Sequence, residues 1–187
     1  MSPSQGIRTG GRSARVQQSV HTAVRDLLTE HGRAELSVPL VAQRAGVTPS
    51  TVYRRWGDLQ ALLSDVAVER LRPEAPPEDT GALESDLRAW ALQFLEEMSS
   101  SPGRGYIRDV LSSDGDSTHA GQCAEYTRER IGVILERATE RGEPVPDAES
   151  VVDHVVAPMM YRILFFASPP TPEWVEGLLR ELLADGP

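Results

Sequence analysis

The chain contains a single cysteine, Cys123, and no lysine among its 187 residues. One cysteine excludes an intrachain disulfide and any metal cluster built from several thiolates of one chain. We expect Cys123 to be a small buried apolar group, with a redox-sensing or ligand-reactive thiol as the alternative. No apolar run approaches the roughly 20 residues of a membrane-spanning helix, and no charged and then apolar leader opens the chain. The composition predicts a cytoplasmic protein with no membrane partner.

Motifs of catalytic, cofactor and metal sites are missing as well. The chain has no Gly-x-Ser-x-Gly, no phosphate-binding glycine loop with a lysine, no His-Glu-x-x-His and no cysteine pair. Asp114 and Asp116, with Glu125 and Glu129, could imitate a carboxylate site, but an Asp-Gly-Asp run in a loop is more often just a solvated turn. His21 and His31 lack partners at metal-ligand spacing and are expected at the surface. The sequence predicts neither an enzyme nor a cofactor or metal site.

The formal net charge of −9 is divided unevenly along the chain. Residues 1–58 contain eight arginines and four acids, for a net charge of +4, whereas residues 59–187 contain 11 arginines and 24 acids, for a net charge of −13. A local basic face suits nucleic acid, and the acidic remainder would discourage the rest of the molecule from lying on DNA.

The stretch 37–62 has the pattern of helix, turn and helix. Ser37 is a suitable N-cap, because its hydroxyl can accept from a free amide of the first turn, and a proline follows where no amide proton is needed. Gly46 ends the first helix, since glycine adopts a positive φ without steric cost. Thr48 can cap the second helix with its side chain, and Pro49 fits the first helical position.

The outward face of this second helix is small, polar and basic. Small side chains at its start would let it enter the major groove of DNA, while a phenol and arginines reach phosphates or base edges. We expect phosphate contacts from Ser37, Thr48, Tyr53 and Arg55. We expect contacts with bases or thymine methyl groups from Pro49, Ser50, Thr51 and Arg54. Trp56 is expected to fill space between helices rather than to stack on bases.

The run Val-Ala-Gln-Arg-Ala-Gly-Val-Thr-Pro-Ser-Thr-Val-Tyr-Arg-Arg-Trp, followed by Ala61-Leu62-Leu63, resembles the DNA-binding signature of the TetR (tetracycline-repressor-type) transcriptional regulators. The resemblance covers about fifty residues, from roughly Val16 to Val66, and its Ala-Gly-Val-x-x-x-x-Val-Tyr-x-x-Trp core is fairly specific. Many members place a phosphate-gripping lysine where this chain has Leu59. A backbone amide near Gly57–Asp58 is the remaining candidate for that contact.

The chain is expected to be all-α and to contain an arm and two domains. Residues 1–12 form a flexible basic arm. Its Arg8 and Arg12, together with Arg15, would follow DNA phosphates or enter a minor groove; the alternative is a frayed terminus with no role. Residues 13–72 form a three-helix helix-turn-helix DNA-binding domain together with a fourth helix capped by Asp58. The first of these helices runs from Ser13, as its cap, to about His31. A proline-rich and acidic stretch then begins residues 73–187, a helical regulatory and dimerisation domain.

Five helices are expected in this second domain. They span residues 82–99, 106–111, 122–141, 147–165 and 173–184. Pro102–Gly105 should separate the first two of these helices, and residues 112–117 should form a loop. Pro158 should kink the fourth helix. Asp147 and Thr171 are expected to cap the last two.

The last two helices are apolar on more than one side. We expect them to pair with the same helices of a second copy, as the family resemblance also implies; the alternative is that both are simply core. The resemblance further implies a ligand cavity between helices. Residues suited to line it are Trp90, Phe94, Met98, Tyr106, Cys123, Tyr126, His154, Met159, Met160 and Phe165, although aromatic and methionine stripes are usually plain core.

These features predict a homodimeric regulator, a repressor released from a palindromic operator by an unknown small apolar or amphipathic effector. Two alternatives remain open. One is a DNA-binding dimer without a ligand. The other is an all-α small-molecule-binding protein or enzyme with a vestigial DNA-binding head.

Overall fold

The computed structural model describes residues 10–112 and 118–184, and every regular element in these ranges is helical. The expected all-α fold is confirmed. The chain divides into two compact units, Met1–Val66 and Ala67–Pro187. Within the described ranges, no helix combines enough length and apolar character to cross a bilayer. Residues 1–9 of the expected arm and 113–117 of the expected loop, including Asp114 and Asp116, lie outside the described residues.

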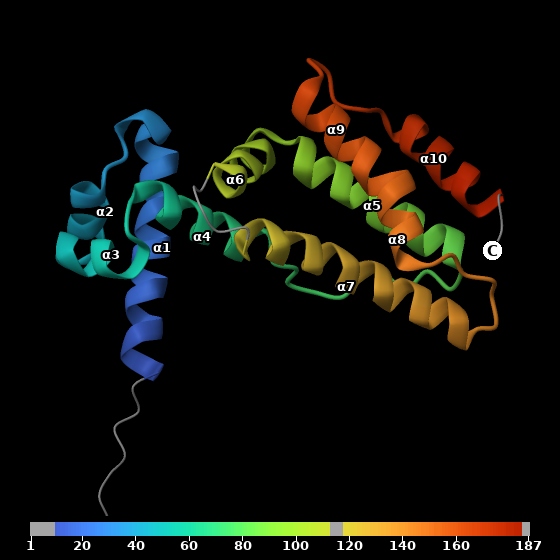
Figure 1. Cartoon of the computed structure of the whole chain (residues 1–187), viewed down its shortest axis with the longest axis horizontal. Coiled ribbons are helices and arrows are strands. Elements are labelled where there is room, and N and C mark those ends of the chain that lie inside the picture. Colours follow the sequence, from blue (N-terminus) through green and yellow to red (C-terminus); the bar gives the residue numbers. More distant parts are fainter. Residues whose placement is uncertain (1–9, 113–117, 185–187) are drawn as a thin grey trace, which may run out of the picture. The chain divides into compact units, whose positions relative to one another are not determined.

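The first unit combines the 22-residue helix α1 with shorter helices (Figure 1), which pack around one apolar core. Its elements are α1 (Gly10–His31), the 3₁₀ turn η1 (Arg33–Glu35), α2 (Val38–Ala45), α3 (Pro49–Trp56) and the first part of α4 (Leu59–Leu71). α1 packs against α2, and α2 against α3. The buried core consists of Val20, Ala23, Val24, Leu27, Leu36, Val38, Val41, Ala42, Val52, Leu62, Leu63 and Val66.

The start of α1 differs from the expectation. The helix begins at Gly10, so Ser13 lies inside it and is not its N-cap. Residues 10–12, expected in the arm, are therefore helical. The end of α1 is as predicted, since Gly32 follows His31 with a φ of +76°.

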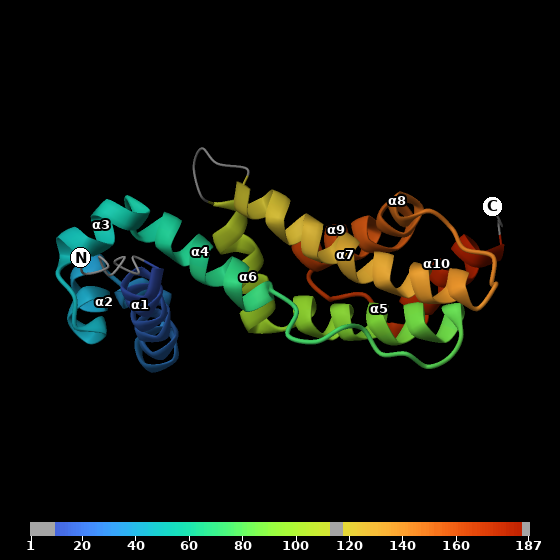
Figure 2. The same ribbon diagram turned by 90° about the horizontal axis from the view of Figure 1, so that it is seen from below.

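The second unit is a helical layer around α5 (Leu83–Ser99). The other elements are α6 (Ser101–Leu111), α7 (Thr118–Glu140), α8 (Ala148–Val151), η2 (Val152–Val156), α9 (Ala157–Phe165) and α10 (Pro172–Ala184). α5 contacts α7 along one side and α9 and α10 along another (Figure 1 and Figure 2). The extended segment after α4 is held along α7, where Arg130 donates to the carbonyl of Ala75 at 2.7 Å and Arg137 to that of Pro77 at 2.9 Å.

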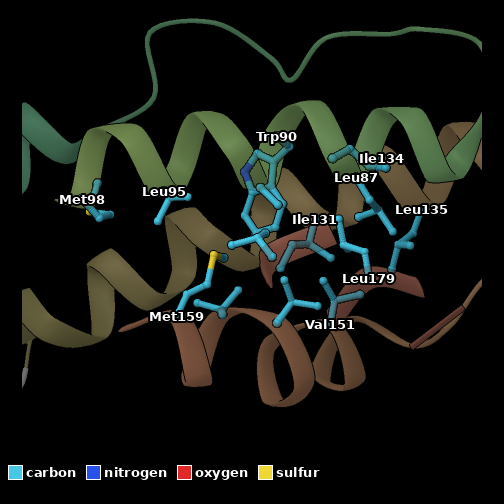
Figure 3. Close-up of a cluster of buried hydrophobic side chains, with 14 of the residues drawn as sticks. Leu87, Trp90, Leu95, Met98, Ile131, Ile134, Leu135, Val151, Met159 and Leu179 are labelled. Atoms are coloured by element: carbon cyan, nitrogen blue, oxygen red, sulfur yellow. The ribbon is translucent and has the colours of Figure 1, made fainter. Parts of the chain in front are cut away.

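The core of this unit is made by side chains from several helical segments that point toward one another (Figure 3). Leu87 and Trp90 come from α5, Ile131 from α7, Met159 from α9 and Leu179 from α10. All five are at most 3% exposed. The expected apolar stripe on the helix at 82–99 is thus directed inward, as a helical period of hydrophobic residues requires.

The predicted break at Pro102–Gly105 is wrong. These residues form the first turns of α6, which begins at Ser101 rather than at Tyr106. The hydroxyl of Ser100 caps the helix by accepting from the amide of Gly103 at 3.0 Å, and a proline early in a helix loses no internal hydrogen bond. α7 also begins earlier than expected, at Thr118.

The segment 147–165 is one irregular helix. Asp147 caps it as predicted, since its Oδ1 accepts from the amide of Ser150 at 2.9 Å. The irregularity expected at Pro158 takes the form of a π-helical segment, η2, directly before it. Proline lacks an amide proton and crowds the carbonyl four residues earlier, so a wider turn accommodates it. Thr171 likewise caps α10, accepting from the amide of Trp174 at 3.4 Å.

α4 belongs to both compact units, because the division at Val66–Ala67 falls inside it. Leu62 and Leu63 are buried in the first core. Ala67 and Val68 are buried in a small cluster with Val110 of α6. The linker inferred after residue 72 follows the end of this helix.

Candidate nucleic-acid interface

The turn between α2 and α3 is set by local chemistry at both of its ends. The hydroxyl of Ser37 accepts from the amide of Leu40 at 3.4 Å and caps α2. Gly46 follows α2 with a φ of +69°, and its amide donates to the carbonyl of Gln43 at 3.2 Å. Both predictions are confirmed. A side chain at Gly46 would be strained in this left-handed conformation.

The first turn of α3 carries three hydroxyl groups that bond to one another. The Oγ1 of Thr48 lies 2.9 Å from the Oγ of Ser50 and 3.0 Å from the Oγ1 of Thr51. Thr48 is the N-cap residue, but its side chain accepts no backbone amide, so the predicted side-chain cap is wrong. The neighbouring hydroxyls compete successfully for the same oxygen. Pro49 occupies the first helical position, as expected.

α3 has one buried and one exposed face. Val52 is fully buried, whereas Pro49, Ser50 and Arg54 are exposed and Tyr53 is 50% exposed. An exposed tyrosine of this extent is unusual for a packing residue, and its hydroxyl is available to a partner. Ser37 and Thr48 are exposed, and Thr51 is half-buried. The structure therefore leaves a small, polar and basic surface along α3.

Arg55 is tied to α1. Its Nη1 donates to the hydroxyl and the carbonyl of Ser13, at 2.8 and 3.0 Å, and its Nη2 donates to the Oε1 of Gln17 at 2.6 Å. Its Cζ lies 5.1 Å from the ring centroid of Trp56. The guanidinium thus joins α3 to α1, although Arg55 itself remains exposed, as does Arg54 at the neighbouring position.

Arg44 is also engaged within the first unit. It forms a two-pronged ion pair with Glu30, with N–O distances of 2.8 and 2.6 Å. The hydrogen bond from Arg44 holds the pKa of Glu30 below its ordinary value. This pair joins α2 to α1, so part of the positive charge counted in the sequence is neutralised by a partner in the same unit.

Leu59, where the family resemblance implied a lysine, is half-buried and packs against the first core. The amide of Gly57 donates to the carbonyl of Tyr53 at 2.8 Å, and the carboxylate of Asp58 accepts from the amide of Ala61 at 2.8 Å. Trp56 packs against the same core, as expected of a space-filling residue. The groups around the start of α4 therefore serve the helix ends and the core.

The residues suited to a ligand cavity fall into three places. Trp90, Met98 and Met159 are buried in the second core, with Phe94 and Met160 packed against it. Tyr106, Cys123 and Tyr126 pack against the small cluster that contains Val110. His154 and Phe165 are exposed.

Two further observations concern this set. Burial raises the pKa of the Cys123 thiol to about 11, so little reactive thiolate forms near neutral pH. An open hollow of about 540 Å³ lies between residues 72–77 and α7. Of the residues expected to line a ligand cavity, Tyr126 lines this hollow.

Comparisons with known proteins agree with this architecture. A model described as bacterial regulatory proteins, tetR family, matches residues 22–66, and one described as tetracyclin repressor-like, C-terminal domain, matches residues 77–182. The HTH-type transcriptional regulator AqdR of Rhodococcus erythropolis is 32% identical over 142 residues, which cover 74% of this chain and 68% of that protein.

Solved structures show the same fold. The TetR family transcription regulator SCO0332 is 28% identical and has a TM-score of 0.70, with 91% of this chain and 97% of that chain covered. The TetR family repressor FadR of Thermus thermophilus, in complex with lauroyl-CoA, is 18% identical with a TM-score of 0.64, over 89% of this chain and 93% of that chain. With a helix-turn-helix at its start and a family domain over more than half of its length, this chain belongs to the TetR family of DNA-binding transcriptional regulators, which are not enzymes.

Proposed function

We propose that the protein is a homodimeric repressor that binds a palindromic operator through α3 of each subunit and is released by a small apolar or amphipathic ligand. The observation that carries the DNA part is the division of α3 into a buried side at Val52 and an exposed side of small, polar and basic residues. One such helix reads only a few base pairs. Two of them, related by a two-fold axis, read two half-sites.

The exposed residues have different expected roles. Pro49 and Ser50 are small enough for the start of α3 to enter the major groove, and Arg54 can donate two hydrogen bonds to a guanine edge. Thr51 contributes a methyl group and a hydroxyl to the same surface. Tyr53 would contact a phosphate through its hydroxyl. Ser37 and Thr48, at the starts of α2 and α3, supply further hydroxyls for the DNA backbone.

The proposed dimer face lies on α9 and α10. Tyr161, Phe165 and Phe166 are 60%, 72% and 54% exposed, and the ring centroid of Tyr161 lies 5.0 Å from that of Phe165. Arg162 covers the ring of Trp174 at 4.2 Å from its centroid. A cluster of exposed aromatic rings is costly in water and marks an interaction surface. A second copy of the same face would bury it symmetrically.

The ligand part of the proposal rests on the second core. Trp90, Phe94, Met98 and Met159 supply aromatic and flexible sulfur-containing side chains that can rearrange around an apolar guest. FadR, which shares this fold, holds lauroyl-CoA. A ligand that fits only one arrangement of the two DNA-binding units would shift the dimer to that arrangement and release the operator.

The dense packing of this core favours a second candidate, a DNA-binding dimer without an effector. Trp90 is 3% exposed and Met159 is fully buried, so a ligand must displace side chains that already fill the space. In that case the second unit would serve dimerisation alone.

The test is selection of bound duplexes from a random pool, repeated with apolar and amphipathic effectors. The repressor proposal predicts a palindromic consensus, binding that weakens as salt is raised, and at least one effector that releases the duplex. A palindrome that no effector releases would favour the ligand-free dimer. Absence of any salt-sensitive duplex binding would overturn both.

A further inference from the structure

The carboxylate of Asp65 on α4 joins three helices of the first unit. Its Oδ2 accepts from the indole Nε1 of Trp56 on α3 at 2.7 Å and contacts the Nε2 of His21 on α1 at 2.8 Å. The side-chain amide of Gln17 on α1 reaches the same oxygen at 3.4 Å. One oxygen atom of α4 therefore ties the end of α3 to α1 as well as to α4.

His21 is part of this arrangement and not of the surface, contrary to the expectation from its spacing. Its side chain is 1% exposed, and its ring centroid lies 6.0 Å from that of Trp56. An ionised carboxylate only accepts hydrogen bonds, so this contact requires the tautomer in which the Nε2 of His21 carries the proton and donates a hydrogen bond to Asp65. The sequence pattern missed this role because the carboxylate lies 44 positions away.

Gln17 connects this cluster to the other bond that holds the end of α3. Its Oε1 accepts from Arg55, and its Nε2 donates to Asp65. The last turn of α3 is therefore attached to α1 and α4 through two consecutive residues, Arg55 and Trp56. Both attachments meet at Gln17.

α3 depends strongly on these attachments. The helix has eight residues, of which only Val52 is fully buried. Val52 and the half-buried Trp56 are the apolar side chains of α3 that pack in or against the first core, so the rotation of the helix end depends on how the indole is held. Tyr53 and Arg54 lie one turn or less before Trp56, so any rotation of the helix end displaces them directly.

We propose that Asp65 is a positioning residue for DNA recognition, which sets the rotation of α3 through the indole of Trp56. The inference rests on the proposed function, since it concerns the presentation of Tyr53 and Arg54 to a duplex. Asp65 does not itself touch DNA. Its carboxylate accepts hydrogen bonds from donors on α1 and α3. Without this acceptor, the end of α3 would be free to move.

The test compares Asp65→Asn with wild type on the duplex that wild type selects from a random pool. The amide keeps the shape of the carboxylate but places an NH₂ group or a weaker acceptor opposite Trp56 and His21. We expect at least about tenfold weaker binding, as for loss of a hydrogen bond to a charged group, and a selected consensus with less discrimination between bases. The indole N–H resonance of Trp56 should move in the NMR spectrum, while the circular dichroism of the helices stays unchanged.

Two further variants separate positioning from simple loss of stability. Val24→Ala removes buried methyl groups of α1 and lowers the melting temperature without altering the Asp65 contacts. At assay temperatures where both variants are folded, Val24→Ala should bind like wild type. Trp56→Phe in the Asp65→Asn background should cause little further loss, because the two changes remove the same contact.

Each remaining outcome overturns a specific claim. If Asp65→Asn binds the selected duplex as tightly and as selectively as wild type, or only as poorly as Val24→Ala, the positioning role is wrong. If the two changes at positions 56 and 65 weaken binding additively, Asp65 does not act through the indole. If wild type selects no duplex at all, the proposed function fails, and this inference fails with it.

Discussion

The guanidinium of Arg55 at the end of α3 donates to both oxygens of Ser13, 42 positions earlier in the chain, at 2.8 and 3.0 Å. The sequence suggested a phosphate contact for this arginine. In the folded chain the same group connects α3 to α1. Arg54 next to it is exposed as well, so the two arginines differ in their bonding partners and not in their exposure.

Replacing Arg55 by alanine should therefore weaken binding to all duplexes by disturbing α3, with little change in the salt dependence. We expect a loss of about 1 kcal/mol in the unfolding free energy, since the bonds are partly exposed. The measurement is binding affinity against salt concentration, together with urea unfolding. A slope of log affinity against log salt that falls by about one would mean that Arg55 reaches a phosphate after all.

Tyr53 and Arg54 should differ in the kind of binding that they support. Tyr53→Phe removes one hydroxyl and should weaken all duplexes alike, by about 1 kcal/mol. Arg54→Ala should cost about 1 to 3 kcal/mol on the preferred sequence and relax the preference at particular base positions. Repeating the duplex selection with each variant distinguishes them. An unchanged consensus for Arg54→Ala would contradict the assignment of a base contact.

Gly103 in α6 has no room for a side chain. A Cβ atom there would lie 2.0 Å from the carbonyl oxygen of Glu97, which is backbone and cannot move aside cheaply. We expect Gly103→Ala to lower the unfolding free energy by about 3 kcal/mol. Gly105→Ala in the same helix is the control, because nothing lies within 4 Å of its added Cβ. It should stabilise by about 0.5 to 1 kcal/mol, and equal effects of both changes in urea unfolding would refute the steric argument.

Phe165 tests the proposed dimer face. Phe165→Glu places a charge among the exposed rings, and we expect the dimer to dissociate about a hundredfold more readily, as for loss of a central interface residue. Leu111→Glu is the matched control, since Leu111 is 61% exposed but lies on α6. Sedimentation velocity over a range of concentrations reports the outcome. If Phe165→Glu remains as dimeric as Leu111→Glu, the interface lies elsewhere.

Asp86 should make the stability of the second unit depend on pH. Burial opposes its ionisation, but hydrogen bonds from Thr80 and Arg141 outweigh this and hold the pKa of Asp86 below its ordinary value of 3.8. A lowered pKa means that the carboxylate stabilises the folded state above about pH 4, and that this contribution is lost as the pH falls through the lowered pKa.

Asp86→Asn should thus cost about 2 kcal/mol at pH 7 and flatten the decline of stability in acid. Asp79→Asn is the control, because Asp79 is 55% exposed and lies 3.4 Å from Arg141. That change should cost less than about 1 kcal/mol. Urea unfolding at several pH values measures both, and an acid profile of Asp86→Asn equal to that of wild type would contradict the role of this carboxylate.

Much of the fold follows from neighbouring residues alone. Ser37, Gly46, Asp147 and Thr171 mark helix ends in the structure as they do in the sequence, because a cap or a positive φ depends on atoms within one turn. The spacing of apolar residues likewise predicted which face of α5 is buried. Family membership also came from one continuous run of residues around α3.

The sequence did not predict hydrogen-bond partners that lie far apart along the chain. The sequence suggested a phosphate contact for Arg55, but in the folded chain Ser13 and Gln17 lie beside it and accept its hydrogen bonds. It suggested a surface position for His21, but Asp65 contacts the buried imidazole. The break expected at Pro102–Gly105 was a local miss instead, since the hydroxyl of Ser100, three positions before Gly103, caps α6 there. The residues near a side chain in the sequence determine its backbone conformation and the helix face on which it lies. Which donor meets which acceptor depends on how helices tens of residues apart pack together. Only the tertiary structure shows that packing.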